Sequence, residues 1–293
     1  MAAVAQPNRA GGNRFRGSNL TELFFRVLLY VAVLVGAVIF AVPFYWMIRT
    51  ALMPTWQVYV FPPAWIPAEY HWENFKTPFA VFPFGGWFLN SALIAIMSAI
   101  GTAVSASMVG FSFARLRFPL RDTLFLIVLA TMIMPEHVRL VPTYLLFVAL
   151  GWVGTYLPLI VPNWFAPAFF VFLLRQFFMT IPKELDDAAF IDGCNPWSLF
   201  WRIHLPLSIP ALGVVIIFMI TFQWNDFLNP LIYIQGVNDF TVALGLRLFQ
   251  GQMTTNMQGL MAASLLAALP TIVMFFFAQR YFVQGIVVSG VKG

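Results

Sequence analysis

Long stretches without a charged side chain constrain this chain more than any other feature. No Asp, Glu, Lys or Arg lies between Arg26 and Arg49, or between Lys76 and Arg115. A helix needs about 20 mostly apolar residues to cross a bilayer, and each stretch is long enough. The chain is 61% hydrophobic and only 9% charged, whereas a soluble domain is about 25% charged. Lipid is therefore the solvent in which this chain is expected to fold.

The apolar pattern predicts an all-α polytopic membrane protein with six transmembrane helices. Proline interrupts the fourth apolar segment three times, and such breaks are tolerated where neighbouring helices or a wet cavity satisfy the freed carbonyls. This favours a bundle with an interior pathway. We expect residues 1–20 to form a disordered basic cytoplasmic tail and residues 21–293 a single transmembrane domain. The six segments lie near residues 27–48, 87–112, 123–147, 155–175, 208–234 and 260–282.

The basic residues predict the orientation of the spans. Cytoplasmic loops of membrane proteins carry an excess of Lys and Arg. With a cytoplasmic N-terminus, six spans leave twelve of the sixteen basic residues inside and four outside. Both termini are therefore predicted to be cytoplasmic, as is the segment between the fourth and fifth spans. An outer loop at about 50–85, rich in Pro, Trp and Tyr, is interpreted as an interfacial aromatic belt, with contact to an outside partner as the alternative.

Carboxylates are scarce, yet they gather in the segment after the fourth span. Four of the eleven Asp and Glu residues fall within nine positions, at Glu184, Asp186, Asp187 and Asp192. Leu185, Ala188 and Ala189 are expected to share one side of a helix there, where small side chains let another surface approach. We interpret the segment as a protein-docking element. The alternative is a pair of amphipathic helices resting on lipid headgroups, which four acids beside an anionic leaflet disfavour.

Local signals in this segment predict a helix, a glycine turn and a second helix. Pro182 suits a first helical turn, and Gly193 can adopt the left-handed conformation that ends a helix. Asn195 followed by Pro196 is typical of a helix N-terminus. The second helix is expected over about 196–204, because Pro206 follows.

The spacing of this segment is specific. Asp-Ala-Ala at 187–189 is followed after three residues by Gly193, and after nine more by Ile203-x-Leu205-Pro206. This spacing resembles the EAA loop of ABC importer permeases, in particular the carbohydrate subfamily, with Asp187 in place of the usual Glu and Cys194 in place of a small residue. Four other strings agree: FARLRFP (113–119), MPEHVRLVPTYLLF (134–147), QWNDFLNPL (223–231) and AQRYFVQGIVVSGVKG (278–293). The last is similar to the end of the maltose-transporter inner-membrane subunit.

The resemblance implies a type I ABC importer permease fold and a non-catalytic transmembrane subunit of an ATP-driven sugar importer. Its implied partners are a second homologous permease subunit, two cytoplasmic ATPase subunits and an extracytoplasmic sugar-binding protein, at a bacterial or archaeal plasma membrane. ATP and Mg would be bound by the ATPase, with no cofactor or metal on this chain. The residues implied to couple to the ATPase are Glu184, Leu185, Asp187, Ala188, Ala189, Asp192 and Gly193.

The sequence itself also indicates that another polypeptide hydrolyses ATP. A phosphate-binding P-loop places glycine directly before its lysine. The chain has three lysines, Lys76, Lys183 and Lys292, and they follow Phe, Pro and Val. One cysteine and three scattered histidines give no metal-ligand spacing.

Polar side chains in the fifth apolar segment are candidates for the substrate pathway. At 100° per residue, the polar positions from 223 to 229 fall on one helix face, where amides and a carboxylate can bind sugar hydroxyls and an indole can stack on a sugar. Hydrogen bonding between helices of the bundle is the alternative. The candidates are Gln223, Trp224, Asn225, Asp226 and Asn229.

A charged patch interrupts the third segment at Glu136, His137 and Arg139. Glu136 and Arg139 have the i, i+3 spacing of a helical ion pair. We interpret the patch as a gate or the lining of the pathway mouth. A proton relay would instead fit an ion-coupled secondary carrier, which is the alternative function. Such a carrier has no need of an acidic docking helix, so the ATP-driven importer is the preferred hypothesis.

Overall fold

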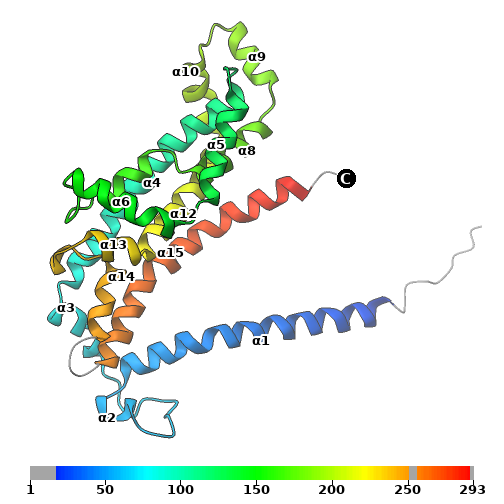
Figure 1. Ribbon diagram of the computed structural model, residues 1–293. Coiled ribbons are helices and arrows are strands. Elements are labelled where there is room, and N and C mark those ends of the chain that lie inside the picture. The colour runs from blue at the N-terminus through cyan, green and yellow to red at the C-terminus, as the bar shows by residue number, and fades with distance from the viewer. Residues whose placement is uncertain (1–17, 251–255, 291–293) are drawn as a thin grey trace, which may run out of the picture.

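The computed structural model describes residues 18–250 and 256–290, and over these residues it contains helices and no strand (Figure 1). The longest elements are α1 (Ser18–Leu52), α4 (Phe84–Arg115), α8 (Ala168–Thr180), α12 (Ile209–Asn225) and α15 (Met257–Gly290). The shorter α-helices are α2 (Thr55–Val58), α3 (Thr77–Val81), α5 (Arg121–Ile133), α6 (Glu136–Ala149), α7 (Leu157–Ile160), α9 (Glu184–Ile191), α10 (Pro196–Leu199), α11 (Leu205–Leu207), α13 (Leu228–Tyr233) and α14 (Val242–Gly245). Four 3₁₀ helices, η1 (Trp72–Phe75), η2 (Val161–Trp164), η4 (Val237–Asp239) and η5 (Leu246–Gln250), and one π-helix, η3 (Phe200–His204), complete the described chain.

The helices long and apolar enough to cross a membrane match the predicted segments in order. Four stretches qualify within the described residues, Glu22–Leu52, Phe84–Arg115, Leu157–Thr180 and Met257–Phe277. The pair α5 and α6 and the pair Pro196–Leu207 and α12 raise the number to six when each bent pair is counted as one span. The fifth span is shorter than predicted, because the helix ends at Asn225 and the chain turns before α13.

Helix α4 forms the centre of the bundle, with α8 and α12 packed along it. The core between these three helices combines small side chains, such as Ala99, Ala106 and Ala211, which let the backbones approach closely, with large apolar side chains from all three helices. Gly110 shows how closely α4 approaches α8, since a Cβ atom built there would lie 3.1 Å from the backbone nitrogen of Arg175. Core members include Ala99, Ala106, Phe111, Val171, Leu174, Phe178 and Val215.

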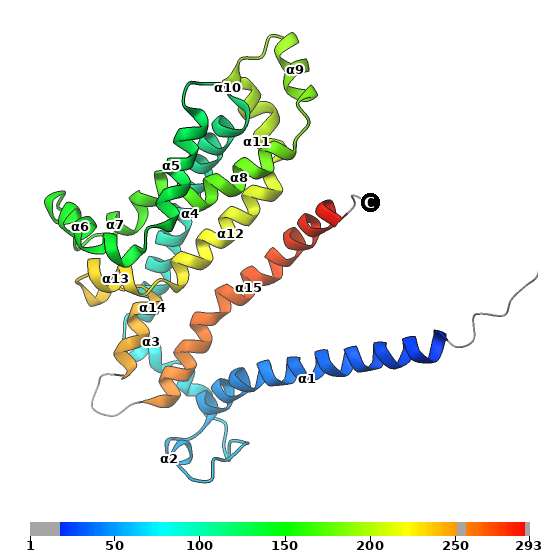
Figure 2. The same ribbon diagram turned by 45° about the vertical axis from the view of Figure 1, so that its right-hand side comes forward.

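The two ends of α4 define the two ends of the bundle. Arg115 lies at the end that carries α9 and α10, which we term the α9 end (Figures 1 and 2). Phe84 lies at the opposite end, termed the α14 end, where it and Trp87 pack against α14, η5 and the start of α15. The Trp87 indole N–H donates to the Val237 carbonyl at 2.7 Å, so this end is held by a specific hydrogen bond as well as by packing.

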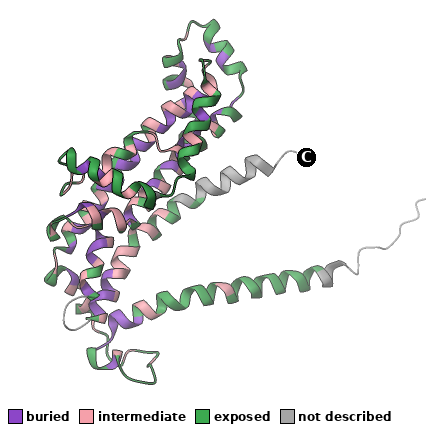
Figure 3. Cartoon of the chain, in the orientation of Figure 1, coloured by how far each residue is buried: buried purple, intermediate pink, exposed green. Residues whose placement is uncertain are grey.

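Helix α1 stands apart from the bundle over most of its length. Both ribbon views show it leaving α15 at an open angle, and its surface is exposed along almost all of its turns (Figures 1, 2 and 3). Apart from Arg26, its large side chains from Leu23 to Ile48 are apolar, so this surface needs lipid or another apolar partner. Only residues 49–54, at its C-terminal end, are consistently buried. The predicted tail at 1–20 lies largely outside the described residues, and its last three positions are the first of α1.

The segment after α1 is an ordered lobe that presents aromatic side chains. The buried Gln57 side chain donates to the Ile66 carbonyl at 3.1 Å and accepts from the Ala68 N–H at 2.9 Å, which closes the lobe on itself. Asn74 fastens it to the end of α1 through the carbonyls of Ala51 and Met53. Exposed aromatic residues of the lobe are Trp56, Tyr59, Phe61, Trp65, Tyr70 and Trp72. This exposure fits the predicted aromatic belt and also an outside contact, so both interpretations stay open.

Candidate functional site

The acidic segment folds as the predicted helix, glycine turn and helix. Helix α9 places Glu184 and Asp187 in its first turn, beside the positive end of the helix dipole. Gly193 follows with φ of +82°, and the Cys194 N–H donates back to the Ala189 carbonyl at 2.9 Å to close the turn. Asn195 then caps α10, its side-chain oxygen accepting the Ser198 N–H at 2.8 Å.

Two boundary predictions for this segment are wrong. Pro182 lies before the start of α9 rather than in its first turn, because the helix begins at Glu184 with Lys183 as its N-cap. The second helix does not stop before Pro206 but continues through η3 and α11 to Leu207. Pro206 lies directly after the π-helix η3, within the first turn of the short helix α11.

The side chains of α9 divide between two environments. Glu184, Leu185, Asp187, Ala188, Asp192 and Gly193 are exposed at the tip of the α9 end. Asp186 and Ala189 are buried. The expectation that Ala189 shares an exposed side with Leu185 is therefore wrong. At 100° per residue Ala189 lies about 60° from Asp186 around the helix, so the face that buries Asp186 buries Ala189 too.

Asp186 is the residue at this end that sequence reasoning did not single out. Its two carboxylate oxygens reach different partners, Arg115 Nη1 at 3.1 Å and His204 Nε2 at 2.6 Å. The side chains of Arg115 and His204 are only 3% and 0% exposed, so the ion pair is shielded from solvent. In the sequence Asp186 is one of four neighbouring acids, and helical periodicity does not single it out, because Asp187 lies even farther from Leu185 around the helix.

The predicted pathway residues separate into two groups. Gln223 and Trp224 face the bundle, where Gln223 Nε2 donates to Ser98 Oγ at 3.3 Å and to the Leu159 carbonyl at 3.2 Å. The Trp224 indole donates to the Ala267 carbonyl at 3.0 Å, which joins α12 to α15. These contacts fit the alternative interpretation of the polar residues, in which they form hydrogen bonds between helices of the bundle and do not bind substrate.

The other three predicted residues lie where α12 ends. Asn225 is exposed, and its amide donates only to the Thr221 carbonyl of its own helix among the bonds described, at 2.8 Å. Asp226 accepts the backbone N–H of Asn229 at 3.2 Å and its side-chain amide at 2.9 Å. The prediction that all these residues share one face of one helix is wrong, because Asp226 ends α12 and Asn229 belongs to α13.

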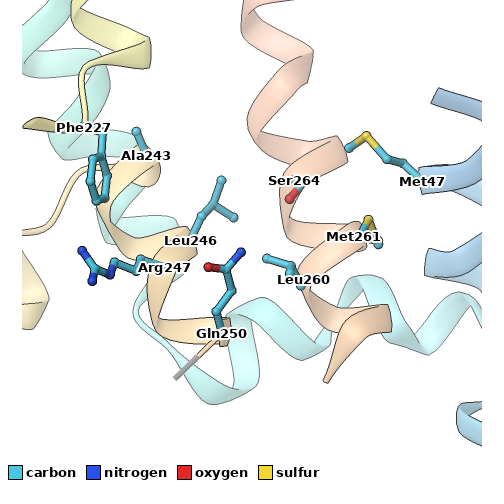
Figure 4. Close-up of a pocket in the computed structure, with 9 residues that line it drawn as sticks. All are labelled: Met47, Phe227, Ala243, Leu246, Arg247, Gln250, Leu260, Met261 and Ser264. Carbon is cyan, nitrogen blue, oxygen red and sulfur yellow. The ribbon is translucent and has the colours of Figure 1, made fainter. Parts of the chain in front are cut away.

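An open cleft of about 680 Å³ lies at the α14 end, between α1, η5 and α15 (Figure 4). Gln250 points its amide into the space between Leu246 and Leu260, while the Arg247 guanidinium extends beneath Phe227, 5.9 Å from the centre of its ring. Ser264 and Met261 from α15 and Met47 from α1 complete the opposite wall. Sequence reasoning did not select these residues, because they are separated in the chain and most are apolar.

The patch predicted as a gate begins α6, directly after the bend from α5. His137 and Arg139 are exposed. The side chain of Glu136 lies outside the described part of the structure, so the expected ion pair with Arg139 stays a prediction.

Comparisons with known proteins identify the class. Residues 106–288 match the family described as binding-protein-dependent transport system inner membrane component. The arabinooligosaccharides transport system permease protein AraQ of Halalkalibacterium halodurans is 38% identical over 71% of this chain and 74% of its own length. The sn-glycerol-3-phosphate transport system permease protein UgpE of Pectobacterium atrosepticum is 33% identical over 92% of this chain and 96% of its own length. The chain belongs to this family of inner-membrane permeases.

A solved structure confirms the fold. A chain of a bacterial ABC transporter involved in the import of the acidic polysaccharide alginate superposes with a TM-score of 0.80, covering 89% of this chain and 98% of its own, at 16% identity. The predicted all-α permease fold is therefore correct. This protein is a transport permease subunit, and the ion-coupled secondary carrier is not favoured.

Proposed function

We propose that this chain is the transmembrane subunit of an ATP-driven importer for a carbohydrate or carbohydrate derivative. The observation that carries the proposal is α9, an exposed acidic helix followed by a left-handed glycine and a second helix with the spacing of the EAA loop. The sequence relatives support the substrate class, since one is named for arabinooligosaccharides and another for sn-glycerol-3-phosphate.

In this proposal α9 docks into a groove of a separate cytoplasmic ATPase subunit. Its exposed surface combines two carboxylates in the first turn with the small Ala188 and the apolar Leu185, which suits a partner offering basic or N–H donors around an apolar centre. Two such ATPase subunits would bind ATP and Mg and hydrolyse the nucleotide. The permease contributes motion of the pathway rather than catalysis.

A second homologous permease subunit would complete the pathway. Helix α1 supports this, because one transmembrane helix standing away from its own bundle leaves apolar surface on both sides of the opening. Ala32 and Gly36 lie four residues apart on α1, and no atom lies within 4 Å of a Cβ built at Gly36, so a partner helix can approach there. The partner permease is thus proposed to lie against α1.

The proposed orientation puts the α9 end and both termini in the cytoplasm, following the excess of basic residues. The α14 end then faces outward, toward an extracytoplasmic binding protein that delivers the substrate. Asn225, exposed where α12 ends, and the cleft lined by Arg247 and Gln250 lie toward this end. We propose that the substrate passes the end of α12, with Asn225, Asp226 and Asn229 toward the pathway and Gln223 and Trp224 holding the helix.

Reconstitution of the assembled transporter tests the proposal. The permease would be co-purified with its partner chains, placed in liposomes with the binding protein outside, and assayed for ATP hydrolysis against a panel of neutral, phosphorylated and acidic sugars. We expect one class to stimulate hydrolysis and to accumulate inside. Uptake driven by an ion gradient without ATP would overturn the proposal. A variant with Asp187→Lys in the docking helix serves as the matched control that should lose stimulation.

A further inference from the structure

We propose that Asp186 is a positioning residue that fastens the docking helix to the transmembrane bundle, while its exposed neighbours contact the ATPase. The acidic cluster thus serves two purposes, with Glu184, Asp187 and Asp192 outside and Asp186 inside. This inference rests on the proposed function of α9 as the ATPase-coupling helix.

The contacts of Asp186 leave it little freedom. Oδ2 pairs with Arg115 Nη1 at 3.1 Å and Oδ1 with His204 Nε2 at 2.6 Å. The Asp186 side chain is 11% exposed, so a docked protein has almost no access to it. A buried carboxylate held at both oxygens is costly to disturb, because removing Arg115 leaves an uncompensated charge and removing His204 leaves a buried oxygen without its hydrogen bond.

Arg115 extends the connection to two transmembrane helices. It is the last residue of α4, and its second terminal nitrogen, Nη2, donates to the carbonyls of Phe178 and Ile181. Those carbonyls lie at the C-terminal end of α8, where a cation is favoured by the helix dipole. One guanidinium therefore joins the ends of α4 and α8 to the carboxylate on α9.

His204 extends the connection to the helix that follows. Its ring packs between Phe111 and Phe178, with centroids 5.0 Å and 5.8 Å away. Nδ1 has no hydrogen-bond partner among the described residues, which fits a ring that carries its proton on Nε2 and donates it to Asp186. His204 ends the π-helix η3, and the chain runs on through α11 into α12.

The carboxylate on α9 is therefore connected to the ends of α4 and α8 through Arg115, and through His204 to the segment that leads into α12. A pull on α9 is therefore transmitted through Asp186 to α4, α8 and the segment that leads into α12, in addition to the covalent chain at either end of α9. The connection makes α9 and the bundle move as one body, which is what coupling of ATP hydrolysis to transport requires.

Neighbouring substitutions separate this role from docking. Asp186→Asn keeps the size of the side chain and removes the charge, and Asp187→Asn does the same one residue away on the exposed side. In the reconstituted transporter we expect Asp186→Asn to keep ATPase association while substrate imported per ATP hydrolysed falls about tenfold, within the range of typical coupling energies. Asp187→Asn should instead weaken ATPase association. Arg115→Gln should lower the import per ATP as Asp186→Asn does, whereas Arg117→Gln, at an exposed position, should leave it unchanged. The double variant of Asp186 and Arg115 should lower the import per ATP no more than either single variant.

A distance measurement provides a readout that does not depend on activity. Cys194 is the only cysteine and lies just after α9, so a spin label there can be paired with one at Arg117→Cys beyond the end of α4. We expect one narrow distance that is the same in the resting and ATP-bound states, and a broad distribution when Asp186→Asn is added. A purely structural role would lower the yield or thermal stability and leave both the distance and the import per ATP unchanged in the surviving protein, which would overturn the inference.

The outcomes also distinguish this inference from the proposed function. If Asp187→Asn weakens ATPase association and Asp186→Asn leaves coupling intact, the docking role stands and the positioning role is wrong. If neither variant nor Asp187→Lys affects the ATPase, α9 is not the coupling helix and the proposed function is wrong. Should Asp186→Asn fail to assemble, Arg115→Lys, which keeps the charge but not the forked contacts, tests the same connection.

Discussion

Gln223 on α12 donates its side-chain amide to the hydroxyl of Ser98 on α4, at 3.3 Å. The same hydroxyl donates to the Leu159 carbonyl at 3.2 Å and accepts from Asn163 at 3.3 Å. Ser98 is fully buried, so this cluster of polar groups lies inside the bundle and joins four helical elements, α4, α7, η2 and α12. In an apolar medium such groups hold helices in register, each bond contributing about 0.6 kcal/mol.

Gln223→Ala should therefore destabilise the bundle. We expect a loss of about 1 kcal/mol in the free energy of unfolding, because two hydrogen bonds to α4 and α7 are removed. Thermal unfolding of the purified protein in detergent measures it. Gln235→Ala is the matched control, since that amide is exposed. Equal melting temperatures for the two variants would show that the Gln223 contacts do not stabilise the bundle.

Asn225→Ala should lower transport and leave the stability of the fold almost unchanged. Its amide bonds within its own helix and its side chain is exposed, so the fold should lose less than about 0.5 kcal/mol. Transport should fall several-fold if Asn225 contacts the passing substrate. Uptake into proteoliposomes and a melting curve on the same preparation separate the two effects. Wild-type uptake by this variant would remove Asn225 from the pathway.

Gly193 allows a test of the turn that follows the docking helix. Its φ of +82° is strained for a residue with a side chain, and a Cβ there would have no atom of this chain within 4 Å, so any effect on the fold of the permease itself comes from backbone conformation. Gly193→Val should cost about 1–2 kcal/mol locally and misplace α9. Gly193→Asn should be nearly neutral, because Asn tolerates the left-handed region. Substrate-stimulated ATP hydrolysis should be lost in the first variant and kept in the second; the same rate in both would show that the turn does not matter for coupling.

The apolar runs were sufficient to predict the class of fold and the order of the spans, because the bilayer requires long apolar helices whatever their neighbours. The same requirement gives no information on how the helices are arranged, because every span must be apolar. Helix α1 is as apolar as the buried α4, yet it stands away from the bundle, and hydropathy does not distinguish contact with lipid from contact with protein. The break after Asn225 was missed because the polar residues there were counted on one continuous helix.

Helix α9 and the turn after it were predictable because the residues that end one helix and begin the next act locally. Gly193 and Asn195 act within a few residues, and their turn and cap appear where the sequence places them. Asp186 was not distinguished from Asp187, because its role depends on Arg115, 71 positions away, and on His204. Such partners are brought together only by the packing of α4, α8 and η3.

Cys194 makes the orientation of the protein testable without a substitution. It is the only cysteine, lies one residue after the turn glycine, and is partly exposed. If the α9 end is cytoplasmic, a membrane-impermeant thiol reagent should fail to label it in intact cells and should label it in inside-out vesicles. Cys194→Ser provides the background in both preparations. Labelling in intact cells would contradict the orientation drawn from the basic residues.

The same thiol reports on docking when the ATPase is added back. In inside-out vesicles stripped of the ATPase, the reagent meets Cys194 at the tip of the α9 end, beside the exposed Asp192 and Gly193. A groove that receives α9 would cover this turn, so adding the ATPase should slow labelling. The slowing should vanish with Asp187→Lys, because that exposed charge faces the docked surface. If adding the ATPase does not change the labelling rate, the conclusion about orientation still holds, but coupling through this turn is contradicted.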